Sequence, residues 1–191
     1  VLFICHPELI EGIEPLVRWR QQEGWKVSVV SSHDIYDQFS FGYMKPEAIR
    51  DFLIATQNNW PPPVPQYVVL AGDSSFDPDR NMKNSMRAYL PYANYDSRNP
   101  IGNPADEWFV RLHAEDALSD LIIGRMGVSS ATEARAVSEK IIRSEKYPVP
   151  GPWRNRMEGF SDLFFEDHYQ KVARSFLPED LILLPYEILC N

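Results

Sequence analysis

Cysteine and clustered positive charge are both scarce in this chain of 191 residues. Its two cysteines, Cys5 and Cys190, cannot form a disulfide framework, and neither has the Cys-x-x-Cys or Cys/His spacing of a metal site. The 19 lysine and arginine residues are outnumbered by 27 aspartate and glutamate residues, giving a formal net charge of −8. Because phosphate backbones are bound by clustered Lys and Arg, this balance argues against nucleic acid as a partner and favours cations or basic peptides.

Long hydrophobic runs are also missing. No apolar run approaches the roughly 20 residues that a membrane-spanning helix needs, so membrane insertion is not expected. Hydrophobic residues nevertheless make up 44% of the chain and aromatic residues 13%, which is typical of a globular protein. A chain of this length can bury a sizeable core.

What the sequence does contain is an alternation of strand and helix patterns in its first 71 residues. The spacing of apolar residues predicts strands at 1–5, 25–30 and 67–71. It predicts one helix at 8–22, which Gly24 ends, and another that begins at Pro46. The residues at 31–45 are predicted to form a loop. A β-helix-β order predicts right-handed parallel crossovers. We therefore expect an α/β fold, a mainly parallel sheet with helices on both faces.

The apolar run at 67–71 is predicted to be the central and most buried strand of that sheet. It is followed directly by an acidic loop that carries Asp73, Asp77 and Asp79. Ligands and ions bind at the carboxyl ends of strands in open α/β sheets, so this loop is a candidate metal or substrate site. The alternative is a turn that is ordered by its own carboxylates.

The rest of the chain contains two further strand patterns, a helix and a linker. We expect a short strand at 106–110, a buried strand at 120–126, and a helix that opens with a Ser130–Glu133 capping box. Three prolines and a glycine at 148–152 can continue neither a helix nor a central strand, so they predict a linker. This divides the chain into an amino-terminal subdomain at 1–147 and a truncated second α/β subdomain at 153–191. In the second subdomain we expect strands at 157–161 and 186–189, with a helix at 166–176 between them.

Several segments in this order resemble the amino-terminal subdomain of the gingipain-type cysteine peptidases. The residues after the linker resemble the opening of that family's second, caspase-like subdomain. The resemblance covers nearly the whole chain up to residue 145. It rests on EPLVRWR at 14–20, GWKV at 24–27, YVVLAGD at 67–73, SDLIIGR at 119–125, ATEA at 131–134 and KIIRSE at 140–145.

The resemblance implies a cysteine endopeptidase that acts on peptide or protein substrates outside the cell or at its surface. In the family, a Cys–His pair in the second subdomain cleaves the peptide bond, and the His lies in a Gly-His-Gly-like stretch. None of the four histidines here precedes a glycine, so this pair is expected downstream of the chain. By position, Asp162 matches an acidic residue near the catalytic His; the alternative is that Asp162 caps the following helix.

Members of the family also bind calcium. Asp73, Asp77, Asp79 and Asp106 offer the oxygen ligands that calcium prefers, although no EF-hand spacing occurs. A solvated acidic loop is the alternative for each of these residues. The rival function is correspondingly a non-catalytic, calcium-stabilised binding or scaffold module.

Other residues suggest sites that have simpler explanations. Cys5 and His6 are adjacent on a strand and point to opposite faces, so Cys5 is expected to be a core residue and not a nucleophile. Arg125 is expected to form a structural ion pair with a nearby acid. The tryptophans Trp19, Trp25 and Trp108 are expected to be core anchors.

Overall fold

The structure is a computed structural model that describes residues 1–93, 104–113, 118–151, 156–158 and 182–184, together with residues 171 and 175. Contacts between residues divide the chain into two compact units, Val1–Lys146 and Tyr147–Asn191. Each unit is described by itself. Within the described residues, no helix is both long and apolar enough to cross a membrane.

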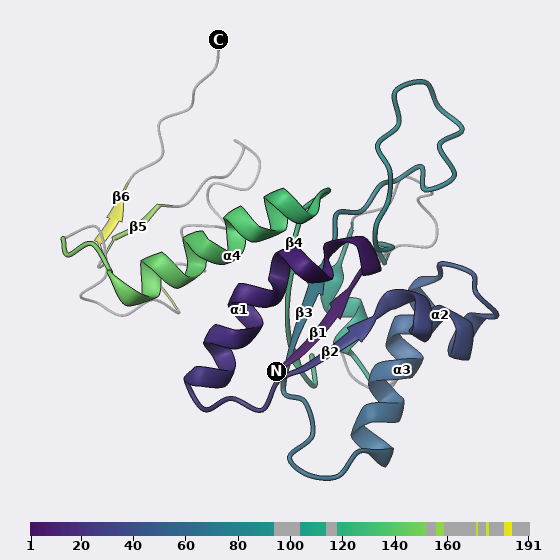
Figure 1. The fold of residues 1–191 in the computed structure, drawn as a ribbon, viewed down its shortest axis with the longest axis horizontal. Helices are drawn as coiled ribbons and strands as arrows, with labels where there is room; N and C mark the ends of the chain where they lie inside the picture. The colour runs from purple at the N-terminus through teal and green to yellow at the C-terminus, as the bar shows by residue number, and fades with distance from the viewer. Residues whose placement is uncertain are drawn as a thin grey trace. The chain divides into compact units, whose positions relative to one another are not determined.

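The first unit is built on a sheet of four parallel strands (Figure 1). The strands are β1 (Leu2–Cys5), β2 (Ser28–Ser31), β3 (Tyr67–Ala71) and β4 (Ile122–Met126), in the order β2-β1-β3-β4. At their carboxyl ends, Cys5 is aligned with Ser31 on one side and with Ala71 on the other. The parallel sheet confirms the predicted α/β fold.

Helices cover both faces of the sheet, as predicted (Figure 1). The helices α1 (Ile10–Gln22) and α4 (Ala131–Lys146) lie on one face, and α2 (Ser32–Ser40) and α3 (Pro46–Asn59) lie on the other. Successive side chains of a strand point to opposite faces, and β1 therefore supplies both cores. Its even-numbered residues pack with α2 and α3, and its odd-numbered residues pack with α1 and α4.

The degree of burial differs from strand to strand. All four side chains of β1 are at most 1% exposed, so β1, and not β3 as the sequence suggested, is the most buried strand. In β3, Tyr67 is 37% exposed. The predicted burial of β4 is also only partly correct, because Ile122 is 62% exposed on what is an edge strand of the described sheet. The position of a strand at the centre or the edge of the sheet decides how far its side chains are buried, and an apolar run in the sequence does not reveal that position.

The loop predicted at 31–45 is wrong, because residues 32–40 form α2. Ser31 caps the helix by accepting a hydrogen bond from the His33 N–H (3.2 Å), and Phe41 ends it in the left-handed conformation (φ 55°). The helix buries Ile35 and Tyr36 against the sheet. A nine-residue segment with so few apolar positions shows too little hydrophobic periodicity for the sequence to distinguish a short helix from a loop.

The strand expected at 106–110 is also wrong, since Asp106–Val110 form a 3₁₀ helix, η2. Phe109 and Val110 are adjacent and both buried. An extended strand covered on one face would bury only one of them, but a tight helical turn can place both in a core. A second 3₁₀ turn, η1 (Pro7–Leu9), precedes α1.

The start of α4 shows a modified form of the predicted capping box. The Ser130 Oγ accepts a hydrogen bond from the Glu133 N–H (3.2 Å), as expected. The Glu133 carboxylate binds the N–H and hydroxyl of Ser129 and not the N–H of Ser130. Of the three tryptophans, Trp19 and Trp108 pack partly against the cores, whereas Trp25 is 45% exposed and contacts Tyr67 edge to face.

Two short parallel strands are described in the second unit, β5 (Arg156–Glu158) and β6 (Ile182–Leu184). The strand β5 overlaps the predicted strand at 157–161. The strand β6 was not predicted, and the strand expected at 186–189 lies outside the described residues. Within the helix expected at 166–176, residues 171 and 175 are described, and both are helical.

Candidate functional site

The candidate site lies where the parallel strands of the first unit end. The chain leaves β3 through Gly72, whose positive φ of 150° suits a residue without a side chain. A Cβ atom there would lie 3.0 Å from the Cβ of Tyr89, because the returning end of the following loop passes over this position. The carbonyl of Asp73 then accepts hydrogen bonds from the N–H groups of both Tyr89 (2.9 Å) and Leu90 (3.1 Å), which closes the loop at its base.

Asp77 orders the loop internally. Its side chain is buried, and its carboxylate accepts hydrogen bonds from the N–H groups of Met82 (2.8 Å) and Asn81 (3.0 Å). Its own carbonyl accepts a hydrogen bond from the Ser85 hydroxyl (3.1 Å). The Met82 and Asn81 N–H groups hold the pKa of the Asp77 carboxyl below its usual value, with burial opposing them. Asp77 therefore behaves as a turn-ordering carboxylate.

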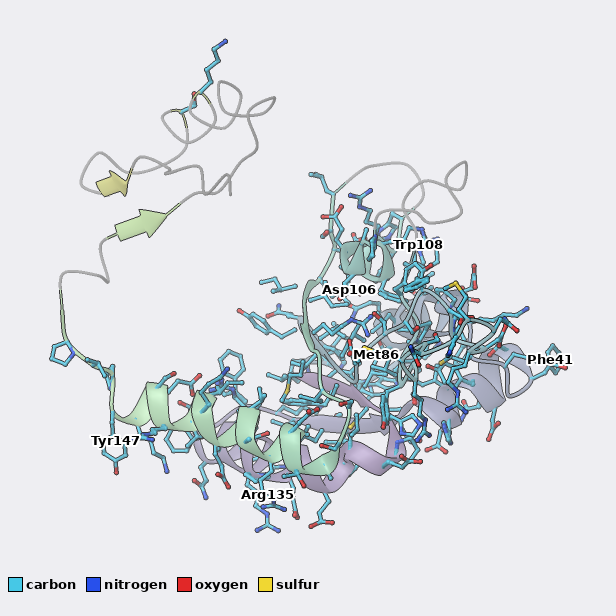
Figure 2. All side chains as sticks on the ribbon, turned by 90° about the horizontal axis from the view of Figure 1, so that it is seen from above. Phe41, Met86, Asp106, Trp108, Arg135 and Tyr147 are labelled. Carbon is cyan, nitrogen blue, oxygen red and sulfur yellow. The ribbon has the colours of Figure 1, made fainter. Side chains whose placement is uncertain are left out.

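Asp106 is joined to β4 by a two-pronged ion pair. The Nε and Nη2 atoms of Arg125 donate to the two carboxylate oxygens of Asp106 at 2.8 and 2.7 Å. The same guanidinium donates to the carbonyls of Gly72 (3.0 Å) and Pro91 (2.9 Å). Arg125 thus forms the expected structural ion pair, and it also fastens both ends of the 72–91 segment to η2, where Asp106 and Trp108 lie (Figure 2).

The other two candidate calcium ligands have different surroundings. The Asp73 carboxylate accepts a hydrogen bond from the Ser74 N–H (2.9 Å), whereas Asp79 is exposed. Among the residues that the structure describes, no three His, Cys, Asp or Glu side chains are grouped so that they could hold a metal ion. Because Asp77 and Asp106 already bind protein donors, the four aspartates as described do not fit one ligand shell. Calcium binding stays a prediction.

A cluster of two imidazoles and two phenols occupies the same end of the sheet. The rings of His6 and His33 lie edge to face with centroids 5.0 Å apart, and Tyr89 packs against His6 in the same way, also at 5.0 Å. The ring of Tyr36 lies 6.4 Å from that of His33. Sequence analysis missed this cluster, although His6 follows β1 directly, His33 lies in the first turn of α2 just after β2, and both could have been found from that position.

The protonation of His6 is set by its surroundings. Its Nδ1 accepts a hydrogen bond from the Glu8 N–H (3.2 Å), so the neutral ring carries its proton on Nε2. Burial is the main cause that lowers the pKa of His6, and the nearby His33 and Arg87 lower it further, against the opposing charge of Glu8. His6 is therefore held as a neutral imidazole.

An ion pair fastens the loop to the start of the first helical segment. The Arg87 guanidinium donates to both carboxylate oxygens of Glu8, at 2.8 and 3.0 Å. It also lies over the ring of Tyr89, 4.7 Å from the centroid. The pair neutralises both charges beside the histidine cluster.

One cleft opens at this cluster, and a second cleft shares the lining residue Met44 with it. The first, of about 300 Å³, is lined by His6, His33, Tyr36, Asp37 and Tyr89, among others. The second, of about 370 Å³, is lined mainly by apolar groups, including Pro78, Pro91, Tyr92 and Trp108. Met44 lines both clefts, so they adjoin one another.

Cys5 has the properties of a core residue, as predicted. Its side chain is fully buried, its Sγ donates to the His6 carbonyl (3.3 Å), and burial raises the pKa of its thiol to about 12. A thiolate nucleophile at this position is therefore excluded at neutral pH. Two other residues named from the sequence, Asp162 and Cys190, lie outside the described residues.

Comparison with known families identifies the chain. The family model for peptidase family C25 matches residues 1–183. The chain belongs to peptidase family C25, the gingipain-type cysteine peptidases. No curated protein sequence matches it. Family membership, together with the fold, supports a role related to peptidases.

Three solved structures share the fold. Dimeric latent PorU from Porphyromonas gingivalis has a TM-score of 0.64 at 21% identity, over 90% of this chain and 18% of that one. The Arg-specific cysteine proteinase gingipain R (RgpB) has a TM-score of 0.60 at 18% identity, and the match covers 95% of this chain and 39% of that one. A complex of the pro- and mature domains of Porphyromonas gingivalis RgpB has a TM-score of 0.56 at 21% sequence identity. The match covers 74% of this chain and 28% of that one. The chain thus spans less than half of each of these three chains.

Proposed function

We propose that this chain is part of a gingipain-like cysteine endopeptidase that cleaves peptide or protein substrates. The observation that carries the proposal is the C25 match over residues 1–183, to which the fold of the four-stranded unit adds support. From the family resemblance, we propose that the protein acts outside the cell or at its surface.

In this proposal the first unit is a scaffold and the bond cleavage takes place elsewhere. A catalytic Cys–His pair would attack the scissile carbonyl through the thiolate, with the imidazole as the general base and then the acid. Cys5 cannot serve as the nucleophile because it is buried and its thiol pKa is raised. The expected His-Gly motif does not occur in this sequence, so the pair is proposed to lie downstream.

Asp162 is proposed as the acid that orients the catalytic imidazole. Such a carboxylate would accept a hydrogen bond from one ring nitrogen and stabilise the protonated ring. Its replacement by asparagine in the active protein should lower kcat while leaving the fold intact. An unchanged kcat would favour the alternative, in which Asp162 caps a helix.

The second candidate function is a non-catalytic, calcium-stabilised binding or scaffold module. It is favoured by one observation, namely that several polar groups at the end of the described sheet hold loops together. Asp77 and Arg125 are the clearest examples.

Activity of the extended protein distinguishes the two functions. A polypeptide that continues beyond Asn191 should hydrolyse a quenched fluorescent protein substrate, and iodoacetamide should abolish the hydrolysis. The variant Cys5→Ala should keep this sensitivity, because Cys5 is not the nucleophile. The 191-residue chain alone should be inactive. Absence of turnover in the extended protein supports the scaffold function, and turnover that resists alkylation contradicts a cysteine nucleophile. Alkylator-sensitive turnover by the short chain contradicts a downstream site.

A further inference from the structure

A third cleft opens at the amino ends of the strands, at the edge of the sheet opposite to the histidine cluster. It has a volume of about 210 Å³. Val1 lines it just before β1, Ser28 at the first position of β2 and Tyr67 at the first position of β3. We call it the Trp25 cleft. Because reacting ligands of open parallel sheets bind at the carboxyl ends of the strands, a ligand of this cleft would be held there and not chemically changed.

Aromatic rings form one corner of the Trp25 cleft. Trp25 is 45% exposed and Tyr67 37%, and their rings meet at 83° with centroids 5.5 Å apart. Neither ring belongs to one of the two described cores. Trp60 also lines the cleft, but it packs partly against a core, where its ring lies 6.1 Å from that of Phe52. Exposed aromatic side chains that gather around a cleft are typical of interaction sites.

Hydrogen-bond donors surround these rings. Four lining side chains carry N–H groups that have no hydrogen bond or ion pair within the described part of the chain. They are Trp25, Lys26, Trp60 and Gln66. Water satisfies these groups in the free protein, so they limit what can replace the water. A ligand that displaces it must offer acceptors, because a donor left without a partner costs free energy.

Acceptors are scarce in the same cleft. No carboxylate is found among the described residues that line it. Several of its backbone carbonyls are already occupied, since that of Val1 accepts from the Ser28 N–H (3.0 Å) and that of Gln66 from the Ile122 N–H (3.0 Å). The Pro65 carbonyl accepts from a side chain of α3 (2.9 Å). The Trp25 cleft therefore suits a ligand that has acceptors but few donors of its own.

A proline-rich segment in the polyproline II conformation has this chemistry. Each proline contributes a carbonyl and no N–H, and the helix has no internal hydrogen bonds, so its carbonyls stay free to accept. Such segments bind in grooves lined by aromatic rings, and their conformation is already formed before binding. A basic segment, by contrast, would find no carboxylate among the described lining residues. An added β-strand would bring N–H groups for which few free acceptors are present.

We propose that the Trp25 cleft binds a proline-rich segment of a partner protein in the polyproline II conformation. A prolyl ring packs in the corner between Trp25 and Tyr67. The indole N–H of Trp25 and the side-chain amide of Gln66 donate to carbonyls of the segment. This site goes beyond the proposed peptidase function, because it holds a partner at the edge of the sheet opposite to the candidate site and does not cleave it.

Binding of a labelled peptide to the 191-residue chain tests the proposal. The probe is a fluorescein-labelled oligomer of L-proline, followed by fluorescence anisotropy. The matched control is the same oligomer of D-proline, which has the same composition and apolar area but forms a helix of the opposite hand. We expect the D-peptide to bind at least about tenfold more weakly, because its rings and carbonyls cannot both reach their partners. Equal binding of the two peptides, or no binding of the L-peptide at millimolar concentration, overturns the proposal.

A variant of Trp25 tests the aromatic corner. Trp25→Leu should weaken binding of the L-peptide by about tenfold, since it removes both the ring and the indole donor. The control is Phe41→Leu, because Phe41 is 95% exposed and does not line the cleft. Unchanged binding by Trp25→Leu, or an equal loss in both variants, overturns the proposal. Circular dichroism confirms that both variants fold.

A variant of Gln66 tests the donors. Gln66→Glu replaces an amide donor by a carboxylate that repels the carbonyl oxygens of the peptide, so binding should weaken by about fivefold or more. Gln38→Glu is the matched control, because Gln38 is exposed on α2, does not line the cleft and undergoes the same change in charge. An equal effect of the two variants would assign the loss to overall charge and overturn the proposal.

The indole N–H signals give a readout that needs no binding-deficient variant. In a ¹⁵N–¹H NMR spectrum, the signals of Trp25 and Trp60 should move when the L-peptide is added. The signal of Trp19 should stay in place, because its N–H already donates to Glu145 (2.8 Å). A Trp25 signal that does not move overturns the proposal. Self-association of the chain without peptide that Trp25→Leu abolishes, measured by analytical ultracentrifugation, would assign the cleft to a second copy and also overturn it.

Discussion

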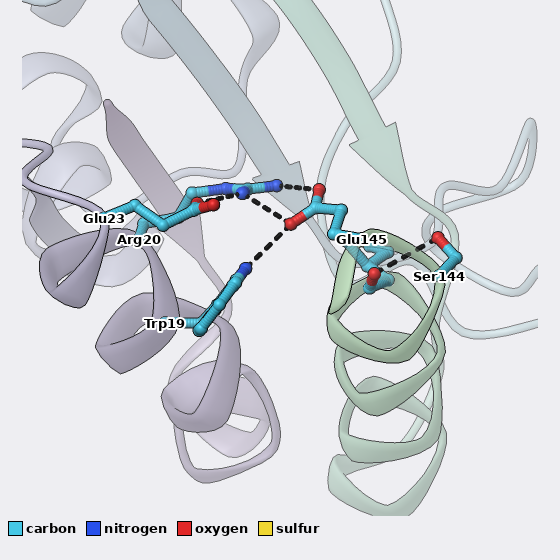
Figure 3. A network of polar contacts seen from close by, with 6 residues as sticks. Trp19, Arg20, Glu23, Ser144 and Glu145 are labelled. Atoms are coloured by element: carbon cyan, nitrogen blue, oxygen red, sulfur yellow. Dashed lines mark hydrogen bonds and ion pairs between the residues drawn. The ribbon is translucent and has the colours of Figure 1, made fainter. Parts of the chain in front are cut away.

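Arg20 and Glu145 join the ends of α1 and α4, which are 125 residues apart in the sequence (Figure 3). The Nη1 and Nη2 atoms of Arg20 donate to the two carboxylate oxygens of Glu145 at 2.8 and 2.6 Å. The indole N–H of Trp19 donates to the same carboxylate (2.8 Å), and Glu23 binds Arg20 from the other side (2.6 Å). Glu145 is thus the acceptor on which the contact between the two helix ends converges.

Replacement of Glu145 by alanine should destabilise the first unit. The change removes the partner of both Arg20 and Trp19, while the partial exposure of the pair limits its strength. We expect a loss of about 1 kcal/mol, or roughly 2–4 °C in the melting temperature, measured by calorimetry. Glu139→Ala is the control, because Glu139 is exposed on the same helix. Equal melting temperatures for both variants would contradict this role of Glu145.

Gly12 permits α1 and α4 to approach closely. A Cβ atom at Gly12 would lie 2.3 Å from the Ala131 carbonyl oxygen and 2.6 Å from the Ala134 Cβ. Gly12→Ala should therefore lower the free energy of unfolding by about 1–3 kcal/mol, despite the higher helix propensity of alanine. In the control Gly124→Ala, the new Cβ meets no heavy atom within 4 Å, so denaturant unfolding should show little change. A tolerated Gly12→Ala would mean that the helices can separate at no cost.

Stability should fall as the pH drops below the ordinary histidine range, in part because of His6. Burial lowers the pKa of His6 from 6.5, so below that pH the unfolded chain takes up a proton that the folded chain resists. The stability lost to this group is at most about 1.4 kcal/mol per pH unit, the limit for one proton. The pKa of the Asp77 carboxyl is lowered from its ordinary value of 3.8, so this group affects a more acidic window.

The variant His6→Asn tests this contribution. Asparagine keeps an acceptor for the Glu8 N–H but cannot titrate. Its melting temperature should fall less than that of the unchanged protein between pH 7.5 and 5.5. Parallel curves for the two proteins would show that His6 titrates equally in the folded and unfolded states.

Variants of Asp77 and Asp79 distinguish calcium binding from the ordering of the loop after β3. Asp77→Asn should lower the melting temperature in EDTA, because it weakens the acceptor for the Asn81 and Met82 N–H groups. The calcium proposal predicts in addition that millimolar calcium raises the melting temperature, and that Asp79→Asn reduces this rise without an effect in EDTA. No rise with calcium would remove the calcium proposal, and an unchanged Asp77→Asn would contradict the loop role.

The sequence predicted those elements whose local signals agree with their tertiary setting. Pro46 begins α3, as its missing N–H allows, and Gly24 follows α1 with a positive φ of 89°. The short helix α2 was missed because its stability comes from burying Ile35 and Tyr36 in a core built by distant strands. Local periodicity contains little of that information.

The candidate site was predictable only in its location. The strand ends gave the correct edge of the sheet, and the structural role of Arg125 was anticipated. The cluster of His6, His33 and Tyr89 joins three segments that are far apart in the sequence, so no motif spacing encodes it. Similarly, nothing in the run of aspartates reveals that Asp106 pairs with Arg125 whereas Asp77 binds its own loop.

The closure of the β3 loop at Asp73 affects how this protein can vary between species. Because the Asp73 carbonyl binds the N–H groups of both Tyr89 and Leu90, the contact between the loop and the sheet depends on the base of the loop and not on its length. Adding residues to such a closed loop costs little, since each doubling of its length changes the closure free energy by only about 0.6 kcal/mol. Insertions and deletions in this loop should therefore leave the sheet intact, but those between residues 78 and 85 would break the hydrogen bonds that Asp77 forms with Asn81, Met82 and Ser85.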